Sequence, residues 1–124
     1  MNIHWANQVS DDWPEVRAEL ERGFEMSRAA AQRGESFVYV VNTNDLLGRG
    51  GVGNAMVATG LLSAARTAAL EGWAKGWTVN VIAWDGEEGQ RDLAATWAER
   101  MLDSHGVTGE LIRLGSGHIG KALP

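Results

Sequence analysis

The sequence alternates between long segments with helical periodicity and short apolar segments, and this alternation constrains the fold more than any other feature. The three segments with apolar residues at helical spacing are residues 11–35, 53–75 and 88–106. The three short apolar segments are residues 36–42, 77–84 and 108–114. The order α-β-α-β-α-β predicts an α/β fold with a parallel sheet of about three strands and right-handed crossover helices.

Length and composition limit the class of protein. The 124 residues are 44% hydrophobic and 22% charged, which predicts one globular domain over residues 1–124. No apolar run is long enough to cross a bilayer, the first ten residues do not resemble a signal peptide, and there is no cysteine. The net charge is −5 and the basic residues are scattered. We therefore expect a cytoplasmic protein without a membrane or nucleic-acid partner.

One short stretch, LGRGGVGNAM, carries glycines at the spacing of a dinucleotide-binding loop. Gly48, Gly50 and Gly53 match the pattern G-x-G-x-x-G, which lets a backbone approach a pyrophosphate at the start of a helix. A phosphate loop leaves its strand directly, whereas residues 43–47 separate this stretch from the preceding apolar segment. A flexible loop is the favoured interpretation, and nucleotide binding stays an alternative.

Other candidate ligand groups show no pattern typical of a site. The histidines lie far apart and lack ligand spacing, so no metal site is predicted; they are His4, His105 and His118. A dense carboxylate group stands at the carboxyl end of the second apolar segment, where α/β proteins often bind ligands. The favoured interpretation is that it complements the positive end of the next helix, and a ligand site stays an alternative; the group comprises Asp85, Glu87 and Glu88. Three of the six tryptophans are expected in the core or at an interface; they are Trp13, Trp73 and Trp97.

Nearly the whole chain resembles, in order, the carboxyl-terminal half of short-chain dehydrogenases/reductases. The run SAARTAALEGWAKGWTVNVIAWDG resembles the segment that follows the catalytic Tyr-x-x-x-Lys pair of that family, and FVYVVN resembles its serine strand. WPEVRAELERGFEMSRAA and VTGELIRLGSG resemble the helix before that strand and the closing strand. The resemblance implies a partial Rossmann-like fold, without the half that binds the cofactor, and it puts GRGGVG away from the cofactor loop of the family.

The same resemblance implies that the catalytic residues are replaced. The tyrosine position falls on Asn54, the lysine position on Ala58, the serine region on Thr43 and Asn44, and the asparagine position on Glu19. An amide is not a general acid near neutral pH, and a methyl group supplies no positive charge. We therefore expect no catalysis by this chain.

What the chain retains is the part of the family that forms subunit contacts. The resemblance implies a noncatalytic subunit that assembles with a full-length dehydrogenase in a hetero-oligomer such as a heterotetramer, with NAD or NADP bound by the partner and no cofactor bound by this chain. The expected partner interface is an apolar stripe on the first two helical segments; it comprises Leu20, Phe24, Val57, Leu61, Ala64, Ala65 and Ala68. The alternatives are an atypical oxidoreductase with its own dinucleotide binding and a self-associating structural remnant.

The apolar strand FVYVV is expected at a sheet edge, because the strand beside it in the family precedes the region that this chain resembles. An apolar edge strand without charge or proline promotes aggregation unless it is covered. We expect it to be covered, either by residues 1–10 folding back or by another polypeptide.

Overall fold

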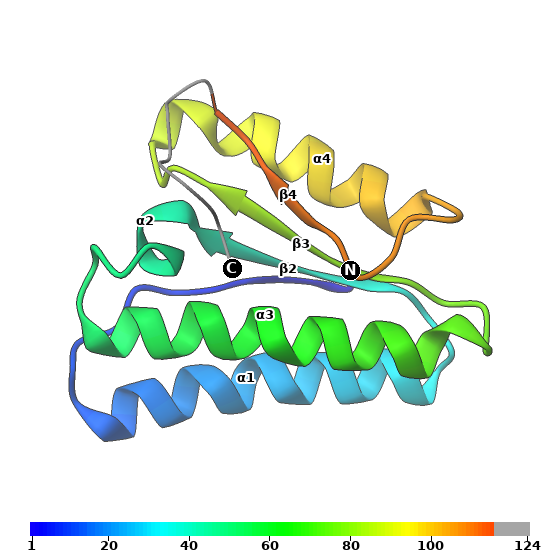
Figure 1. Cartoon of the computed structure of the whole chain (residues 1–124), viewed down its shortest axis with the longest axis horizontal. Coiled ribbons are helices and arrows are strands. Elements are labelled where there is room, and N and C mark those ends of the chain that lie inside the picture. Colours follow the sequence, from blue (N-terminus) through cyan, green and yellow to red (C-terminus); the bar gives the residue numbers. More distant parts are fainter. Residues whose placement is uncertain (116–124) are drawn as a thin grey trace.

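The computed structural model describes residues 1–115 and shows a four-stranded parallel sheet in the order β1-β2-β3-β4 (Figure 1). The strands are β1 (Ile3–Trp5), β2 (Phe37–Asn42), β3 (Val79–Trp84) and β4 (Leu111–Arg113). The predicted α/β fold is confirmed, and the sheet has one strand more than the sequence indicated.

The additional strand is β1, which covers the outer edge of β2. Ile3 pairs with Val38 and Trp5 pairs with Val40, and the Ala6 N–H donates to the Val40 carbonyl at 2.9 Å. Of the two covers expected for the FVYVV strand, the structure therefore shows the folding back of the first residues. Three residues are too few to show a periodicity, so the sequence pattern did not predict this strand. It is a strand because it pairs with the open edge of β2.

Within residues 1–115, four α-helices and one turn of 3-10 helix connect or follow the strands. They are α1 (Trp13–Gln32), α2 (Thr43–Leu46), α3 (Val52–Trp73), η1 (Glu88–Gln90) and α4 (Arg91–Asp103). Pro14 lies in the first turn of α1, where its missing N–H costs nothing. In the described part of the chain, no helix is both long and apolar enough to span a membrane.

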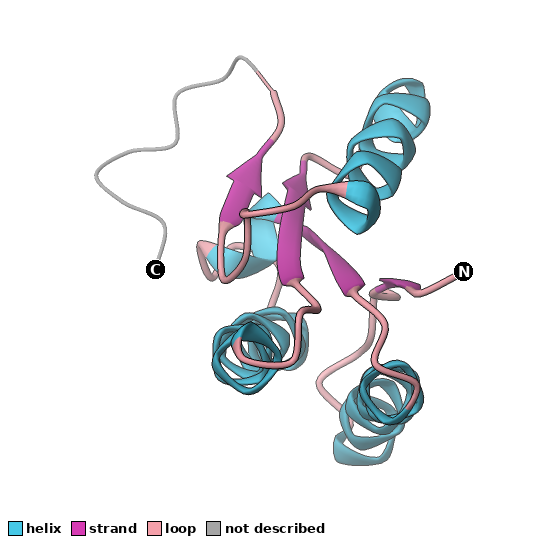
Figure 2. Ribbon diagram, turned by 90° about the vertical axis from the view of Figure 1, so that its right-hand side faces the viewer, coloured by secondary structure: helices cyan, strands magenta, loops and turns pink. Residues whose placement is uncertain are grey.

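The helices form a layer on each face of the sheet (Figure 2). α1 and α3 pack on one face, over a core that includes Phe37, Tyr39 and Val41 of β2. α4 packs on the other face, over Val38 and Val40 of the same strand. Because successive side chains of a strand point to opposite faces, an apolar run such as FVYVV is typical of a strand that is buried on both sides.

The connection from β3 through α4 to β4 contradicts one prediction made from the sequence. The strand order advances in one direction from β1 to β4, but α1 and α3 lie on one face and α4 on the other. A crossover that advances in the same direction over the opposite face has the opposite hand. The prediction that all crossovers are right-handed is therefore wrong for at least one of them. In this position α4 buries Val38, Val40 and Ile82, which α1 and α3 leave uncovered.

Candidate functional site

The four positions that the sequence aligned with catalytic residues occupy three different environments. Ala58 is buried in the core between α3 and the sheet, and Asn44 is exposed on α2. Glu19 on α1 and Asn54 on α3 are both buried, and each binds a different part of the segment formed by residues 4–9. The described chain thus uses two of these positions to hold its own first residues in place.

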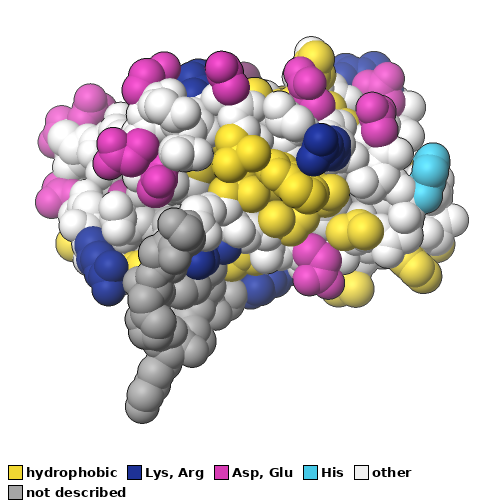
Figure 3. Space-filling model, turned by 90° about the horizontal axis from the view of Figure 1, so that it is seen from above, with side chains coloured by type: hydrophobic (Ala, Val, Ile, Leu, Met, Phe, Trp, Pro, Cys, Tyr) yellow, Lys and Arg dark blue, Asp and Glu magenta, His cyan; other side chains and the backbone are white. Residues whose placement is uncertain are grey.

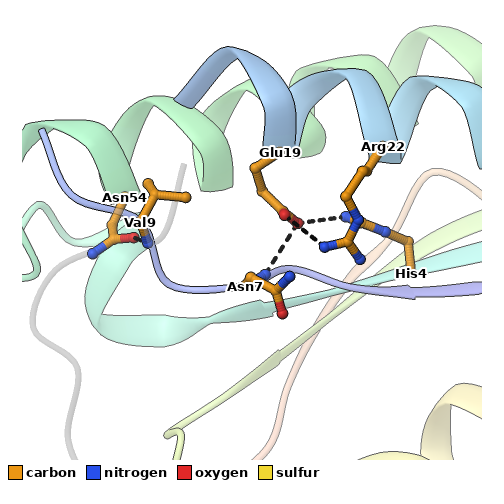
Figure 4. A network of polar contacts seen from close by, with 6 residues as sticks. All are labelled: His4, Asn7, Val9, Glu19, Arg22 and Asn54. Carbon is orange, nitrogen blue, oxygen red and sulfur yellow. Dashed lines mark hydrogen bonds and ion pairs between the residues drawn. The ribbon is translucent and has the colours of Figure 1, made fainter. Parts of the chain in front are cut away.

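Glu19 is the centre of a buried polar network (Figure 4). Its Oε2 atom accepts hydrogen bonds from His4 Nε2 at 2.9 Å and from the Asn7 N–H at 3.0 Å, and its Oε1 atom accepts from Arg22 at 2.9 Å. Burial lowers the pKa of His4, and the nearby Arg22 charge lowers it further, whereas Glu19 opposes this shift. A neutral His4 donates its Nε2–H to the carboxylate, so the network joins β1 to α1.

Asn54 holds the next part of the same segment. Its Oδ1 atom accepts a hydrogen bond from the Val9 N–H at 2.7 Å, and its Nδ2 atom donates to the Gly50 carbonyl at 2.8 Å. The side chain is 8% exposed, and both ends of the amide are engaged. At the position aligned with the catalytic tyrosine, the structure therefore has a side chain that holds the backbone of Val9 and Gly50 in place.

Three of the four glycines of GRGGVG have the G-x-G-x-x-G spacing, and these three meet different surroundings. A Cβ on Gly50 would lie 2.1 Å from Asp45 Oδ1, and a Cβ on Gly53 would lie 2.3 Å from the Ser10 carbonyl oxygen, whereas one on Gly48 would meet nothing within 4 Å. The Gly53 N–H, at the start of α3, donates to Asp11 Oδ1 at 2.9 Å. Close internal packing accounts for Gly50 and Gly53. The carboxylates of Asp11 and Asp45 lie beside the backbone that would have to hold a phosphate, and their negative charge argues against such a ligand.

Asp45 is a buried carboxylate beside this loop, at the end of the sheet where the strands have their carboxyl termini. Its Oδ2 atom accepts a hydrogen bond from Gln8 Nε2 at 2.6 Å. Burial raises the pKa of Asp45, and the hydrogen bond from Gln8 partly opposes the shift. The nearby Thr43 hydroxyl is buried without a hydrogen-bond partner among the described residues.

We expect the substitution Asp45→Asn to stabilise the protein at neutral pH. Because the pKa of Asp45 is raised in the folded state, the folded protein binds this proton more tightly than the unfolded chain. The free energy of unfolding therefore falls as the pH rises from 3.8 through the raised pKa, and above that pKa the full loss of stability is present. Asparagine cannot ionise and keeps an acceptor for Gln8. The expected gain at pH 7 is about 1 kcal/mol, or about 4 °C in Tm, in thermal unfolding.

The gain from Asp45→Asn should shrink as the pH is lowered toward 4, because the wild-type carboxyl then becomes protonated. Asp85→Asn is the matched control, since Asp85 is exposed after β3 and should change stability by less than about 0.5 kcal/mol. A variant Asp45→Asn that is less stable than the wild type at pH 7 would show that the carboxylate charge is favourable in the fold.

Other candidate ligand groups are dispersed. His4 belongs to the Glu19 network, His105 is exposed and His118 lies outside the described residues. Glu87 and Glu88 are exposed before α4, where the Glu87 N–H donates to Asp85 Oδ1. Among residues 1–115, no three histidine, aspartate or glutamate side chains are grouped closely enough to hold a metal ion.

The predicted interface stripe divides into an inner and an outer part. Val57, Leu61 and Ala65 are buried against the sheet of this chain, so a partner cannot contact them in this fold. The outer part consists of Leu20, Phe24, Ala64 and Ala68, which are half-buried or exposed; the Phe24 side chain is 62% exposed. Helix α3 is apolar on several sides, so periodicity alone could not assign its inner side.

The structure also exposes apolar residues that the sequence analysis did not assign to the stripe. Among residues 1–115, six of the eight large hydrophobic residues that are exposed lie on α1 or α3. Besides Phe24 they are Trp13, Val52, Met56, Leu70 and Trp73. The helices α1 and α3 therefore carry most of the exposed large hydrophobic residues of the described chain.

A groove of about 750 Å³ runs between α1 and α3 and reaches the sheet. Its floor is formed by Phe37, Tyr39 and Trp77, and burial raises the pKa of the Tyr39 hydroxyl. All four outer stripe residues, Leu20, Phe24, Ala64 and Ala68, contribute to its walls. The candidate functional site of this chain is thus a helical surface with a groove in it.

The face of the molecule that carries α4 also has an apolar area. Figure 3 shows hydrophobic side chains gathered in the middle of this face, between charged groups. Near the start of α4, the Arg91 guanidinium lies 4.1 Å from the ring centre of Trp5, and Trp5 packs edge-on against Trp84. These contacts stabilise the packing of α4 against the ends of β1 and β3.

The comparisons with known proteins concern the fold. No protein-family model and no curated protein matches the sequence. A solved structure, 3-hydroxyacyl-CoA dehydrogenase type-2 from Mycobacterium avium, matches with a TM-score of 0.63 and 18% sequence identity over 86% of this chain. The match covers 57% of that structure, so this chain corresponds to little more than half of its length. The chain therefore has a Rossmann-like α/β fold similar to part of a short-chain dehydrogenase/reductase.

Proposed function

We propose that this chain is a noncatalytic subunit that assembles with a full-length, NAD(P)-dependent short-chain dehydrogenase and stabilises it in a hetero-oligomer. The observation that carries the proposal is that six of the eight exposed large hydrophobic residues of the described chain lie on α1 or α3. Exposed apolar residues on a helical surface favour a protein–protein contact, because burying them against a partner removes apolar surface from water.

The absence of catalysis is supported by the surroundings of Asn54 and Ala58. Asn54 cannot donate a proton near neutral pH, and both ends of its amide already bind backbone groups. Ala58 is buried in the core, where a lysine would place an unpaired charge. The role of the chain would then be structural, with the acid, the base and the cofactor supplied by the partner.

Small residues on the outer side of α3 support a contact between helices. Gly60, Ala64 and Ala68 line the groove beside α1, and side chains of this size allow another helix to approach closely. The rim carries Phe24, which can serve as an anchor in the contact. Two such subunits with two full-length subunits would form a heterotetramer.

We expect Ala64→Arg to separate the complex when the chain is co-expressed with a dehydrogenase encoded by a neighbouring gene. Ala64 is exposed, so the arginine should leave the fold intact while it places a bulky charge in the contact. Size-exclusion chromatography should show two separate species with helical circular dichroism, and the dehydrogenase should lose most of its activity. Ala68→Glu should have the same effect.

The matched control is Thr96→Arg, which adds the same charge on an exposed position of α4. It should leave both the complex and its activity unchanged. An intact and fully active complex containing Ala64→Arg would exclude the α1–α3 surface as the interface and would remove the main support for the proposal.

A further inference from the structure

We propose that the groove between α1 and α3 binds a small amphipathic acid, with an apolar chain along the groove and a carboxylate at one end. This inference goes beyond the proposed function, because it concerns a ligand of the chain by itself. It depends on the shape of the groove, on its lining, and on a buried indole N–H that lacks an acceptor.

The shape of the groove follows from small residues that bring the two helices together at one point. A Cβ on Gly23 of α1 would lie 2.7 Å from Leu61 of α3, and one on Gly60 of α3 would lie 3.3 Å from Leu20. Beyond this contact the space between the helices reaches the sheet, with a volume of about 750 Å³. Ligand pockets of proteins have volumes of about 300–1,000 Å³.

Most of the lining is apolar. The floor is aromatic, and the walls are formed by aliphatic side chains and by Phe24 at the rim. An unbranched alkyl chain suits such a groove, because it can bury its surface without leaving polar groups unpaired. The apolar part of the lining comprises Leu20, Phe24, Ala31, Phe37, Tyr39, Leu61, Ala64, Ala68 and Trp77.

The charges in the lining favour an anionic end group. The groove contains two cations, Arg28 and Lys75, and one carboxylate, Glu71, which leaves one positive charge in a chain whose net charge is −5. Neither cation forms an ion pair with a described residue. Glu71, which lines the groove, stands four residues before Lys75, whereas Glu25, three residues before Arg28, is outside the lining. Within the lining, Arg28 is therefore the cation without a carboxylate at helical spacing.

Trp77 provides a second observation, a buried N–H donor without an acceptor on a residue that lines the groove. Its ring lines the groove, the residue is 3% exposed, and its indole N–H has no hydrogen-bond partner among the described residues. Buried polar groups in proteins are almost always satisfied, so such an N–H calls for an acceptor. A carboxylate oxygen is a strong acceptor for an N–H donor.

The ligand and the proposed partner subunit would use the same surface, because Phe24, Ala64 and Ala68 belong both to the groove and to the outer stripe. An acid in the groove would then compete with assembly. The binding itself does not depend on the existence of a partner, so it is measured on the purified chain.

Isothermal titration calorimetry of the chain with sodium decanoate at pH 7.5 tests the proposal, with decanol as the uncharged probe. We expect saturable binding of one decanoate per chain and weaker binding of decanol. Arg28→Gln should weaken decanoate binding about fivefold and leave decanol binding unchanged, as loss of one partly exposed charge contact implies. Arg17→Gln, on the same helix but outside the groove, is the matched control and should change neither.

A second pair of measurements locates the ligand. Ala68→Phe should fill the groove and weaken the binding of both probes at least tenfold; Phe24→Ser, at the exposed rim, should also weaken both and does not depend on tolerance of a larger side chain. In a ¹⁵N–¹H spectrum, the indole signal of Trp77, assigned from its loss in Trp77→Phe, should move on addition of decanoate.

Absence of saturable decanoate binding would overturn the proposal, as would equal binding of decanoate and decanol that Arg28→Gln does not change. Either result would leave the proposed assembly to be judged by the Ala64→Arg experiment alone. A decanoate complex in which the Trp77 signal does not move would place the ligand elsewhere and would also overturn the proposal.

Discussion

Replacing Glu19 by alanine is expected to lower the free energy of unfolding by about 3 kcal/mol and Tm by about 10 °C. Glu19 is 3% exposed, and its carboxylate accepts hydrogen bonds from His4, from the backbone of Asn7 and from Arg22. The alanine would leave the His4 ring and the Asn7 N–H without their acceptor inside the protein. Leaving buried donors unpaired is among the more costly effects of a single substitution.

The loss should be largest where Glu19 acts, in the segment that contains β1. Amide hydrogen exchange of residues 3–9 should accelerate more than that of β2 and β3, because β1 is short and is held by this network at its side. Urea denaturation and hydrogen exchange followed by NMR measure the two effects separately.

Glu21→Ala is the matched control for Glu19→Ala. Glu21 forms an ion pair with Arg17 at 2.9 Å on the exposed side of the same helix. Exposed pairs of this kind contribute little, so the control should cost less than about 0.5 kcal/mol. Equal losses from the two substitutions would contradict the role assigned to the buried network.

The second large effect is expected for Gly53→Ala, at the start of α3. A Cβ at this position would lie 2.3 Å from the Ser10 carbonyl oxygen and 3.1 Å from Val16 Cγ2. The backbone of residue 10 must move to admit it, and overpacking of this kind costs about 1–3 kcal/mol. We expect a net loss of about 2 kcal/mol in urea denaturation, although alanine favours a helix more than glycine does.

Gly48→Asn separates this explanation from a general requirement for glycine in the loop. Gly48 has a φ of 76°, which asparagine tolerates better than most residues, and a Cβ there would meet nothing within 4 Å. The substitution should therefore change stability by less than about 0.5 kcal/mol. If Gly53→Ala is as stable as the wild type, close packing against Ser10 is not the reason for glycine at that position.

The spacing of apolar residues along the chain determined much of the layered architecture. The strands predicted at residues 36–42 and 77–84 correspond to β2 and β3, and the helical segments at 53–75 and 88–106 correspond to α3 and α4. These elements carry their signal locally, in periodicity and in the Gly-rich or polar residues that interrupt it. The burial of β2 on both faces was also evident, because FVYVV has no polar position.

Part of the candidate site could be predicted as well. The outer stripe residues Phe24 and Ala64 follow from helical spacing, since each lies on an apolar side of its helix. Their neighbours Val57, Leu61 and Ala65 are equally apolar, and only the position of the sheet decides that these three face inward. The groove depends on how closely two helices from different parts of the chain approach each other.

Only the tertiary structure decided the partners of His4, Glu19 and Asn54, the pairing of β1 with β2, and the hand of the last crossover. The hydrogen bonds of Glu19 and Asn54 to the first residues join positions 12 to 45 apart in the sequence, where no local pattern connects donor and acceptor. β1 is a strand because β2 had an open edge, and α4 lies on its face because Val38, Val40 and Ile82 had to be covered. Local propensity determines which segments become helices and strands. Where each element packs is determined by the burial of apolar residues that the other elements leave exposed.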